Sequence, residues 1–212
     1  MDGRVESSPR DGGSLGPMPQ ISPQEFERLP LRVHEFLAGV PLHDVWAVDL
    51  PRLRSGITLD EFVRASGARL FTPSPVVRAL LSIRRFVGGL FSWDREPDAS
   101  VRQSFAIRLT ATDISRSLEP AGTREGPFRL VYRFDNEQLL ELSNRTAHAA
   151  ALSALAETPG TYRFYFAVYV RSVGRWTPVY MASIDPFRRL VVYPSLLRSV
   201  RTTWRQAFGT AR

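Results

Sequence analysis

The chain contains no cysteine and no lysine, and only three of its 212 residues are histidine. Without cysteine, disulfide bonds, thiolate metal sites and cysteine nucleophiles are excluded. Long hydrophobic runs are also missing; the uncharged stretch over residues 146–156 is mostly alanine and much too short to cross a bilayer. No apolar run follows the early charges, so we expect no secretory signal and a cytoplasmic protein.

All 28 basic residues are therefore arginine, and they are unevenly distributed. Residues 1–185 carry 22 arginines and 21 acidic residues, whereas residues 186–212 carry six arginines and no acid, so nearly all of the net charge of +7 lies at the C-terminal end. Such an end is either the solvated face of a packed helix or a contact for an anionic membrane surface or an acidic partner. No aromatic stacking surface or groove-reading motif accompanies it, which argues against nucleic acid as a partner.

Motifs of the common enzyme classes are missing as well. The sequence has no G-x-S-x-G, P-loop, G-x-G-x-x-G or H-E-x-x-H motif. The three histidines are not at metal-ligand spacing, so we expect no metal and no cofactor, and we interpret His34 and His43 as structural or surface residues. The sequence thus assigns neither a catalytic residue nor an oligomeric state.

The N-terminal residues 1–20 are rich in glycine, proline, serine and charge, so we expect a disordered tail there and a single domain over 21–212. Two capping boxes, Ser22–Glu25 and Thr58–Glu61, predict short helices, the second ending near Gly67. A longer and mostly apolar helix is expected over residues 75–91.

Alternating apolar residues predict strands in the remainder of the chain. The predicted strands are His43–Leu50, Ser104–Ala111, Phe128–Phe134, Gln138–Ser143 and Thr161–Val170. In the last of them, one face carries Tyr162, Phe164, Phe166, Val168 and Val170, and the other carries Arg163, Tyr165, Ala167 and Tyr169. The segment 146–157 is ambiguous, because its alanine content favours a helix and its position between two strands favours a strand.

The pattern becomes helical again after Gly174, with a helix start expected at Thr177–Pro178 and a break or kink at Pro186 and Pro194. Beyond these prolines, three apolar residues form one stripe and three arginines lie off it: Leu197, Val200 and Trp204 in the stripe, and Arg198, Arg201 and Arg205 outside it. The order of elements predicts an α+β fold, with helices gathered on one side of a curved antiparallel sheet.

This order, together with Gly174–Arg175 and the segment Tyr180–Arg189 (Y-M-A-S-I-D-P-F-R-R), resembles an uncharacterised bacterial family of domains of unknown function. That family is similar to the START-like, or polyketide-cyclase-like, helix-grip superfamily, and the resemblance covers roughly Leu31 to Phe208. It implies a curved sheet that grips a long C-terminal helix, and a strand over 146–157. Relatives tend to have P-F-H-R where this chain has Pro186–Arg189, so Arg188 replaces a histidine of the family. Relatives also tend to have an acidic run that includes a histidine where this chain has Asn144–His148, which keeps the histidine but has no acid.

The resemblance also implies a cavity between the sheet and the helix. We expect its lining to include Tyr132, His148, Tyr162, Phe164 and Phe166, although the same aromatic residues would also serve as core alone. The expected function is therefore a domain that binds a small hydrophobic molecule or acts as an accessory domain. One alternative is a cyclase- or hydratase-like enzyme that uses His148, Tyr132 or an arginine in this cavity. Another is an interaction module whose basic surface is Arg198, Arg201 and Arg205.

Overall fold

The structure, a computed structural model, describes residues 20–67, 103–143, 148–172, 182 and 185–209. Six antiparallel strands form one sheet in the order β1-β6-β5-β4-β3-β2. The strands are β1 (Leu42–Pro51), β2 (Arg124–Glu125), β3 (Phe128–Arg133), β4 (Glu137–Ser143), β5 (His148–Thr158) and β6 (Thr161–Arg171). The helices are α1 (Pro23–Glu27), α2 (Val33–Phe36), α3 (Leu59–Ser66), the 3-10 helix η2 (Phe105–Arg108), α5 (Ala111–Arg116), the π-helical turn η3 (Arg188–Val192) and α7 (Tyr193–Phe208).

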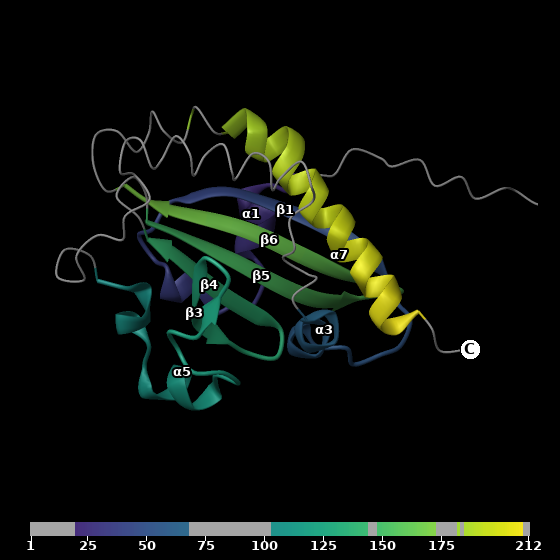
Figure 1. The fold of residues 1–212 in the computed structure, drawn as a ribbon, viewed down its shortest axis with the longest axis horizontal. Coiled ribbons are helices and arrows are strands. Elements are labelled where there is room, and N and C mark those ends of the chain that lie inside the picture. The colour runs from purple at the N-terminus through teal and green to yellow at the C-terminus, as the bar shows by residue number, and fades with distance from the viewer. Residues whose placement is uncertain (1–19, 68–102, 144–147, 173–181, 183–184, 210–212) are drawn as a thin grey trace, which may run out of the picture.

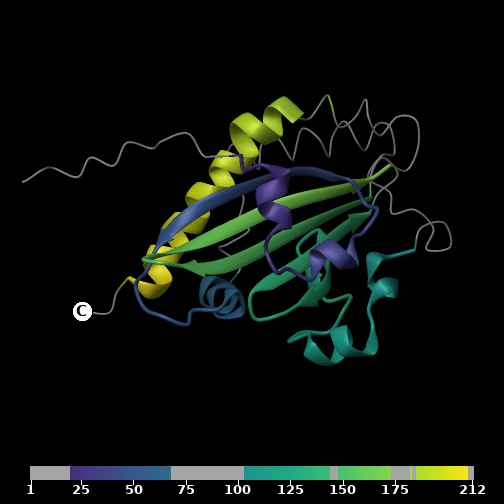
Figure 2. The same ribbon diagram turned by 180° about the vertical axis from the view of Figure 1, so that it is seen from behind.

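The curved sheet carries the C-terminal helix across one face. Figure 1 shows α7 crossing this face diagonally, and Figure 2, from behind, shows α1 against the other. The predicted α+β fold is thus confirmed, and the arrangement is consistent with a helix-grip architecture. The helix expected over 75–91, the helix start at Thr177–Pro178 and nearly all of the expected tail lie outside the described residues.

Both faces of the sheet are covered, which corrects the expectation that the helices gather on one side. The side chains of β6 alternate as predicted between two hydrophobic clusters. On what we call the α7 face, Tyr162, Phe164, Phe166, Val168 and Val170 pack with α3 and α7. On the opposite α1 face, Tyr165, Ala167 and Tyr169 pack with α1, α2 and η2.

The alanine-rich segment forms a strand, as the resemblance implied. β5 pairs with β6 along its whole length, from His148↔Arg171 to Thr158↔Thr161, and Gly160 supplies the positive φ of the turn between them. Two of its alanines lie directly opposite tyrosines, in the pairs Ala150↔Tyr169 and Ala154↔Tyr165. The small side chains leave room for these rings on the α1 face, so packing between strands outweighs the helical propensity of alanine.

The apolar stripe of the C-terminal helix is also confirmed. Leu197, Val200 and Trp204 are completely buried, and the Trp204 indole N–H donates a hydrogen bond of 2.9 Å to the carbonyl of Pro51 at the end of β1. The chain stays helical from residue 185 to residue 208, so Pro194 does not end the helix. It lies in the first turn of α7, where a missing N–H costs little, and the irregularity takes the form of the π turn before it.

The strand predicted over Ser104–Ala111 is wrong. This segment forms η2 and begins α5, because Ser104 and Thr110 cap the two helices with their side chains. Thr110 accepts from the backbone N–H of Asp113, whose carboxylate accepts from the N–H of Thr110 in return. Of the three apolar residues that suggested alternation, only Phe105 is buried, and Ile107 is 61% exposed.

Replacing Phe164 by alanine should lower the free energy of unfolding by about 3–5 kcal/mol, because its side chain is fully enclosed and its ring lies 6.5 Å from that of Phe62. Phe166→Ala should cost less, since this side chain is only partly buried. Urea denaturation followed by fluorescence measures both. Leu190→Ala, at a position that is 77% exposed, is the control and should change stability by less than about 0.5 kcal/mol. Equal losses for Phe164→Ala and Leu190→Ala would contradict the packing.

Candidate functional site

The five residues predicted to line one pocket lie on two faces of the sheet. Tyr132 and His148 are on the α1 face, where their rings contact Phe36 and Phe105. Tyr162, Phe164 and Phe166 belong to the cluster on the α7 face. Because the sheet itself separates the two groups, the structure does not bring all five to a common cavity.

Two members of this set are ordinary core residues. Tyr162 accepts a hydrogen bond of 3.0 Å from the N–H of Ile57 and donates one of 3.1 Å to the carbonyl of Arg54. Phe164 is buried between α3 and the sheet. Only Phe166 is partly open, and its ring centroid lies 5.9 Å from that of Tyr193.

His148 has an acidic partner after all. Its Nε2 lies 3.3 Å from Oε2 of Glu141 on the neighbouring strand, and its ring stacks on Phe105 at 4.1 Å. Burial works to raise the pKa of Glu141, but hydrogen bonds from His148, Ser104 and the N–H of Phe105 outweigh it, so the pKa is lowered. Glu141 and His148 are both buried and hydrogen-bonded to each other, which indicates a structural pair.

A different group of polar side chains meets where the start of β1 lies against the helical segment before α7. We call it the edge cluster; its members are His43, Asp44, Asp185, Arg188 and Tyr193. Neighbouring strand residues normally point to opposite faces. The register between β1 and β6 shifts at this point, however, from Leu42↔Tyr169 to Asp44↔Val168, so His43 is the extra residue of a β-bulge. The bulge allows adjacent residues to reach one cluster, with His43 Nε2 3.9 Å from Asp44 Oδ2.

The helical half of the edge cluster depends on a second irregularity. The backbone N–H of Tyr193 donates to the carbonyl of Arg188, a bond across five residues that defines the π turn. Both side chains then reach the same carboxylate oxygen: Asp44 Oδ2 lies 3.1 Å from the Tyr193 hydroxyl and 3.4 Å from Arg188 Nη2. One turn earlier, Asp185 Oδ1 lies 2.8 Å from His43 Nε2 and 3.3 Å from Arg188 Nη1.

Asp44 is the buried centre of the cluster. It is only 3% exposed, and its Oδ1 atom has no hydrogen-bond partner among the described residues. Burial raises the pKa of Asp44, although the charge of Arg188 and the hydrogen bond from Tyr193 act against this. The side chains of His43 and Asp185 remain about a quarter exposed, at 24% and 23%, so solvent reaches the cluster from their side.

This arrangement supports two kinds of chemistry. His43 Nε2 lies within hydrogen-bonding distance of Asp185 Oδ1, and a histidine–carboxylate pair of this kind supports acid–base chemistry. In addition, His43, Asp44 and Asp185 offer one nitrogen and two oxygen atoms that all lie within 4.8 Å of one another. An aromatic group adjoins the cluster, since the Trp46 ring lies 5.2 Å from that of Tyr193, and the buried Trp46 Nε1 has no partner in the described part of the chain.

Sequence reasoning missed this site. His43 was interpreted as a structural or surface residue, so it was not connected with Asp185, whereas His34 packs edge-on against Phe26 at 4.9 Å. Asp185 and Arg188 lie 142 and 144 residues from their β1 partners, so no local spacing connects them. The available signal was the resemblance itself, because Tyr180–Arg189 contains both residues.

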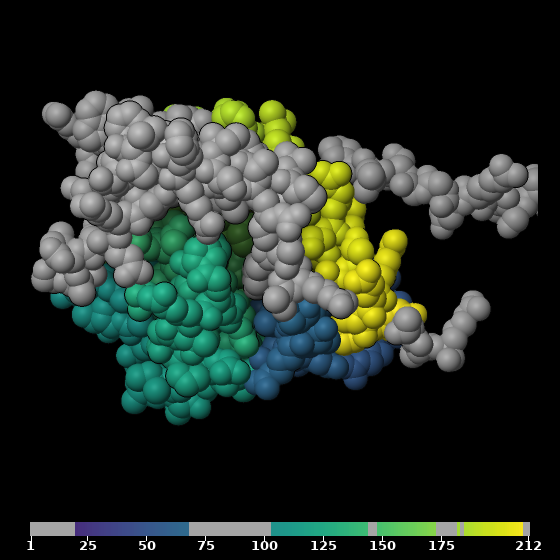
Figure 3. Space-filling view, viewed as in Figure 1, coloured from purple at the N-terminus to yellow at the C-terminus, as the bar shows by residue number. Residues whose placement is uncertain are grey.

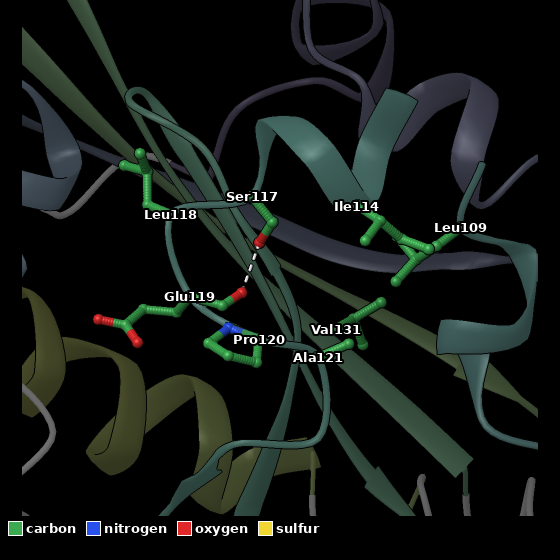
Figure 4. A pocket seen from close by; sticks show the side chains of 8 residues that line it. All are labelled: Leu109, Ile114, Ser117, Leu118, Glu119, Pro120, Ala121 and Val131. Carbon is green, nitrogen blue, oxygen red and sulfur yellow. Dashed lines mark hydrogen bonds between the residues drawn. The ribbon is translucent and has the colours of Figure 1, made fainter. Parts of the chain in front are cut away.

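A separate pocket of about 380 Å³ lies between α5 and β3 (Figure 4). Its lining is Leu109, Ile114, Ser117, Leu118, Glu119, Pro120, Ala121 and Val131. The Ser117 hydroxyl is used in a 2.7 Å hydrogen bond to the carbonyl of Glu119, which Figure 4 shows as a dashed line. The lining is mostly apolar and lacks a group of convergent polar side chains, so the edge cluster is the better candidate site.

A family model described as "Protein of unknown function (DUF2867)" matches residues 36–195, which is more than half of the chain. The chain belongs to the DUF2867 family. All five residues of the edge cluster lie within the matched range, whereas most of α7 lies beyond it. No curated protein and no solved structure matches this DUF2867 chain. None of its described helices is long and apolar enough to cross a membrane.

The DUF2867 domain holds another buried carboxyl group on the α1 face, at Glu137. Its Oε1 accepts a hydrogen bond of 2.9 Å from the N–H of Arg32, and its Oε2 has no partner among the described residues. Burial raises the pKa of Glu137 to about 7, in spite of the backbone N–H groups of Arg32 and Val33. The folded protein therefore holds this proton more tightly than the unfolded chain, whose ordinary value is 4.5.

It follows that the stability contributed by the Glu137 proton is complete below about pH 4.5 and is lost as the pH rises to about 7. Glu137→Gln should remove this loss. Relative to the wild type, the variant should gain roughly 2–3 kcal/mol in unfolding free energy between pH 4.5 and pH 8. Paired denaturant titrations measure the difference. The exposed Glu157→Gln is the control, and parallel pH profiles for wild type and Glu137→Gln would show that burial does not retain the proton.

Proposed function

We propose that the domain binds a small molecule with an apolar body and a polar end, using the edge cluster and the aromatic residues beside it. One observation carries this proposal: a β-bulge and a π turn converge on the same buried carboxylate, Asp44. Bulges and π turns are over-represented next to functional sites, because each re-aims side chains at some cost to regular hydrogen bonding.

Unsatisfied polar atoms support the same proposal. Asp44 Oδ1 and Trp46 Nε1 are both buried without a partner among the described residues, and they lie on alternate residues of β1. Each such atom costs about 1–3 kcal/mol of desolvation free energy. A bound molecule would relieve that cost if it brought an acceptor oxygen to the Trp46 N–H and a donor or a cation to Asp44.

The apolar body of the ligand would lie on the α7 face of the sheet. Phe166 and Ala149 are partly buried there, and Trp46 and Tyr193 connect them to the edge cluster. Figure 3 shows the molecule from this side, with α7 in yellow next to α3 in blue. Of the pocket residues expected from the sequence, Phe166 is the one that this site retains. A ligand beneath a C-terminal helix agrees with the START-like resemblance.

The enzyme alternative would use the same place. The cyclase- or hydratase-like reaction was expected to depend on His148, Tyr132 or an arginine. The 2.8 Å contact between His43 and Asp185 favours His43 as the acid–base group instead, because its side chain reaches solvent whereas His148 is 1% exposed.

Native mass spectrometry of the protein purified from its own host should reveal a bound small molecule that is released on denaturation. Tyr193→Phe and His43→Gln should reduce the bound fraction, because they remove polar contacts of the edge cluster while keeping most of the packing. Tyr165→Phe makes the same chemical change on the α1 face and should leave the bound fraction unchanged. Absence of any adduct, or equal loss in Tyr193→Phe and Tyr165→Phe, would reject the proposal.

A second candidate function is contact with an anionic membrane surface. Arg198 and Arg205 are exposed and Arg201 is half-buried, and none of them has an acidic partner in the described part of the chain. The apolar contact cannot come from Trp204, which is completely buried. It would come instead from Phe187 and Leu190, which are 55% and 77% exposed near the start of the helical segment.

The triple variant Arg198→Gln, Arg201→Gln, Arg205→Gln should therefore lose binding to vesicles that contain anionic lipid. Each arginine contributes on the order of 1 kcal/mol near such a surface, and salt should weaken the binding. Co-sedimentation at low and high salt measures the effect. The matched control neutralises three exposed arginines elsewhere, Arg28, Arg52 and Arg124. If the wild type stays in the supernatant with anionic vesicles at low salt, the basic surface is only a solvated face.

A further inference from the structure

Three side chains of the edge cluster form a set of potential metal ligands. One atom each from His43, Asp44 and Asp185 lies within 4.8 Å of the other two. Metal bonds from nitrogen and oxygen ligands are about 2.1 Å long, so two ligands of one ion lie about 3–4 Å apart. The distances from His43 Nε2, 2.8 Å to Asp185 Oδ1 and 3.9 Å to Asp44 Oδ2, are close to this spacing.

An acidic cluster alone does not indicate a metal site, but the Asp44 carboxylate supplies independent support. It is almost completely buried, and its Oδ1 has no partner among the described residues. Buried carboxylate oxygens are normally hydrogen-bonded or paired with a cation. His43 and Asp185 keep about a quarter of their side chains exposed, so an ion could enter from their side.

Among the described residues, Arg188 contacts both carboxylates, and Arg189 Nη2 lies 3.6 Å from Asp185 Oδ2. The contacts of Arg188 are long, at 3.4 Å to Asp44 Oδ2 and 3.3 Å to Asp185 Oδ1, whereas charge-assisted bonds of this type are usually about 2.7–2.9 Å. Its Nη2 also bonds to the Tyr193 hydroxyl. Asp44 Oδ2 thus contacts Arg188 and Tyr193 and also lies 3.9 Å from His43 Nε2, whereas Oδ1 has no partner among the described residues.

We propose that His43, Asp44 and Asp185 bind a divalent metal ion, which deepens the function proposed above by placing the ion within that ligand site. One imidazole and two carboxylates suit Mn²⁺, Co²⁺ or Zn²⁺ better than Ca²⁺ or Mg²⁺, which prefer oxygen ligands alone. Three protein ligands leave coordination positions open for an oxygen of the small molecule. The same oxygen would be an acceptor for the Trp46 indole N–H.

Isothermal titration calorimetry of the untagged, chelator-stripped protein with Mn²⁺, Co²⁺ or Zn²⁺ tests the proposal with the metal alone. At least one of the three ions should bind with a stoichiometry of one per chain. Asp44→Asn, His43→Gln and Asp185→Asn should each weaken its affinity by about 100-fold or more, since even outer partners of a metal site are worth 10–100-fold. Asp49→Asn, an exposed acid on the same strand, and His34→Gln are matched controls and should bind as the wild type does.

Arg188→Gln separates a metal site from an ion-pair network. Removing a positive charge near the ion should strengthen binding at least about tenfold. The proposal is overturned if no ion binds the wild type with a Kd below about 1 mM, if an ion binds only after Arg188→Gln, or if the ligand variants and the controls behave alike. Circular dichroism checks folding, and His43→Gln and Asp185→Asn keep the test valid if Asp44→Asn does not fold.

The two proposals fail in different ways. Retention of the small molecule by a protein that binds no ion would reject the metal site alone. Metal binding without any small-molecule adduct would reject the ligand alone.

Discussion

Burial of both faces of β6 is the constraint on which the arrangement of the other described elements depends. Tyr162 and Phe164 on one face and Tyr165 and Tyr169 on the other must all be kept from water, so one layer of helices is not enough. α3 and α7 cover the first face, and α1, α2 and η2 cover the second. Because β1 and β5 flank β6, they are enclosed by the same helices. The edge cluster forms where this enclosure meets the start of β1, the first strand of the sheet.

Asp44 shows why that edge is unusual. A carboxylate at the edge of a sheet normally points into water and protects the edge from pairing. Here the helical segment before α7 covers the Asp44 carboxylate. Arg188 and Tyr193 supply polar contacts in place of water, but only to Oδ2. Replacing Asp44 alone by an apolar residue would leave the Arg188 guanidinium and the Tyr193 hydroxyl without the oxygen that both contact, which is destabilising. Asp44 therefore holds the helical segment against β1 through polar contacts.

The sequence predicted the elements whose side chains follow a regular period. The alternation in Thr161–Val170, the stripe of Leu197, Val200 and Trp204, and the capped helix after Thr58 are all present in the structure. It failed at Ser104–Ala111, where local side-chain caps outweigh an apparent alternation. Prediction from the sequence also failed at the edge cluster. Tertiary contacts, a β-bulge and a π turn create this cluster, and none of them leaves a local pattern in the sequence. Proximity of Asp185 to His43 depends on how the helix lies on the sheet, which no spacing reveals.

The π turn has a consequence for the way the C-terminal helix can vary. It contains one residue more than an α-helical turn would need, so the residues before it are rotated by about 100° relative to those after it. The stripe after the turn holds α7 on the sheet, whereas Asp185, which contacts His43, lies before it. A one-residue deletion within Arg188–Val192 would restore a regular helix and leave the stripe seated, yet Asp185 would swing away from His43. The packing of α7 on the sheet and the contact of Asp185 with His43 thus depend on two different angular phases of one helix, and a single-residue change in length can alter one without the other.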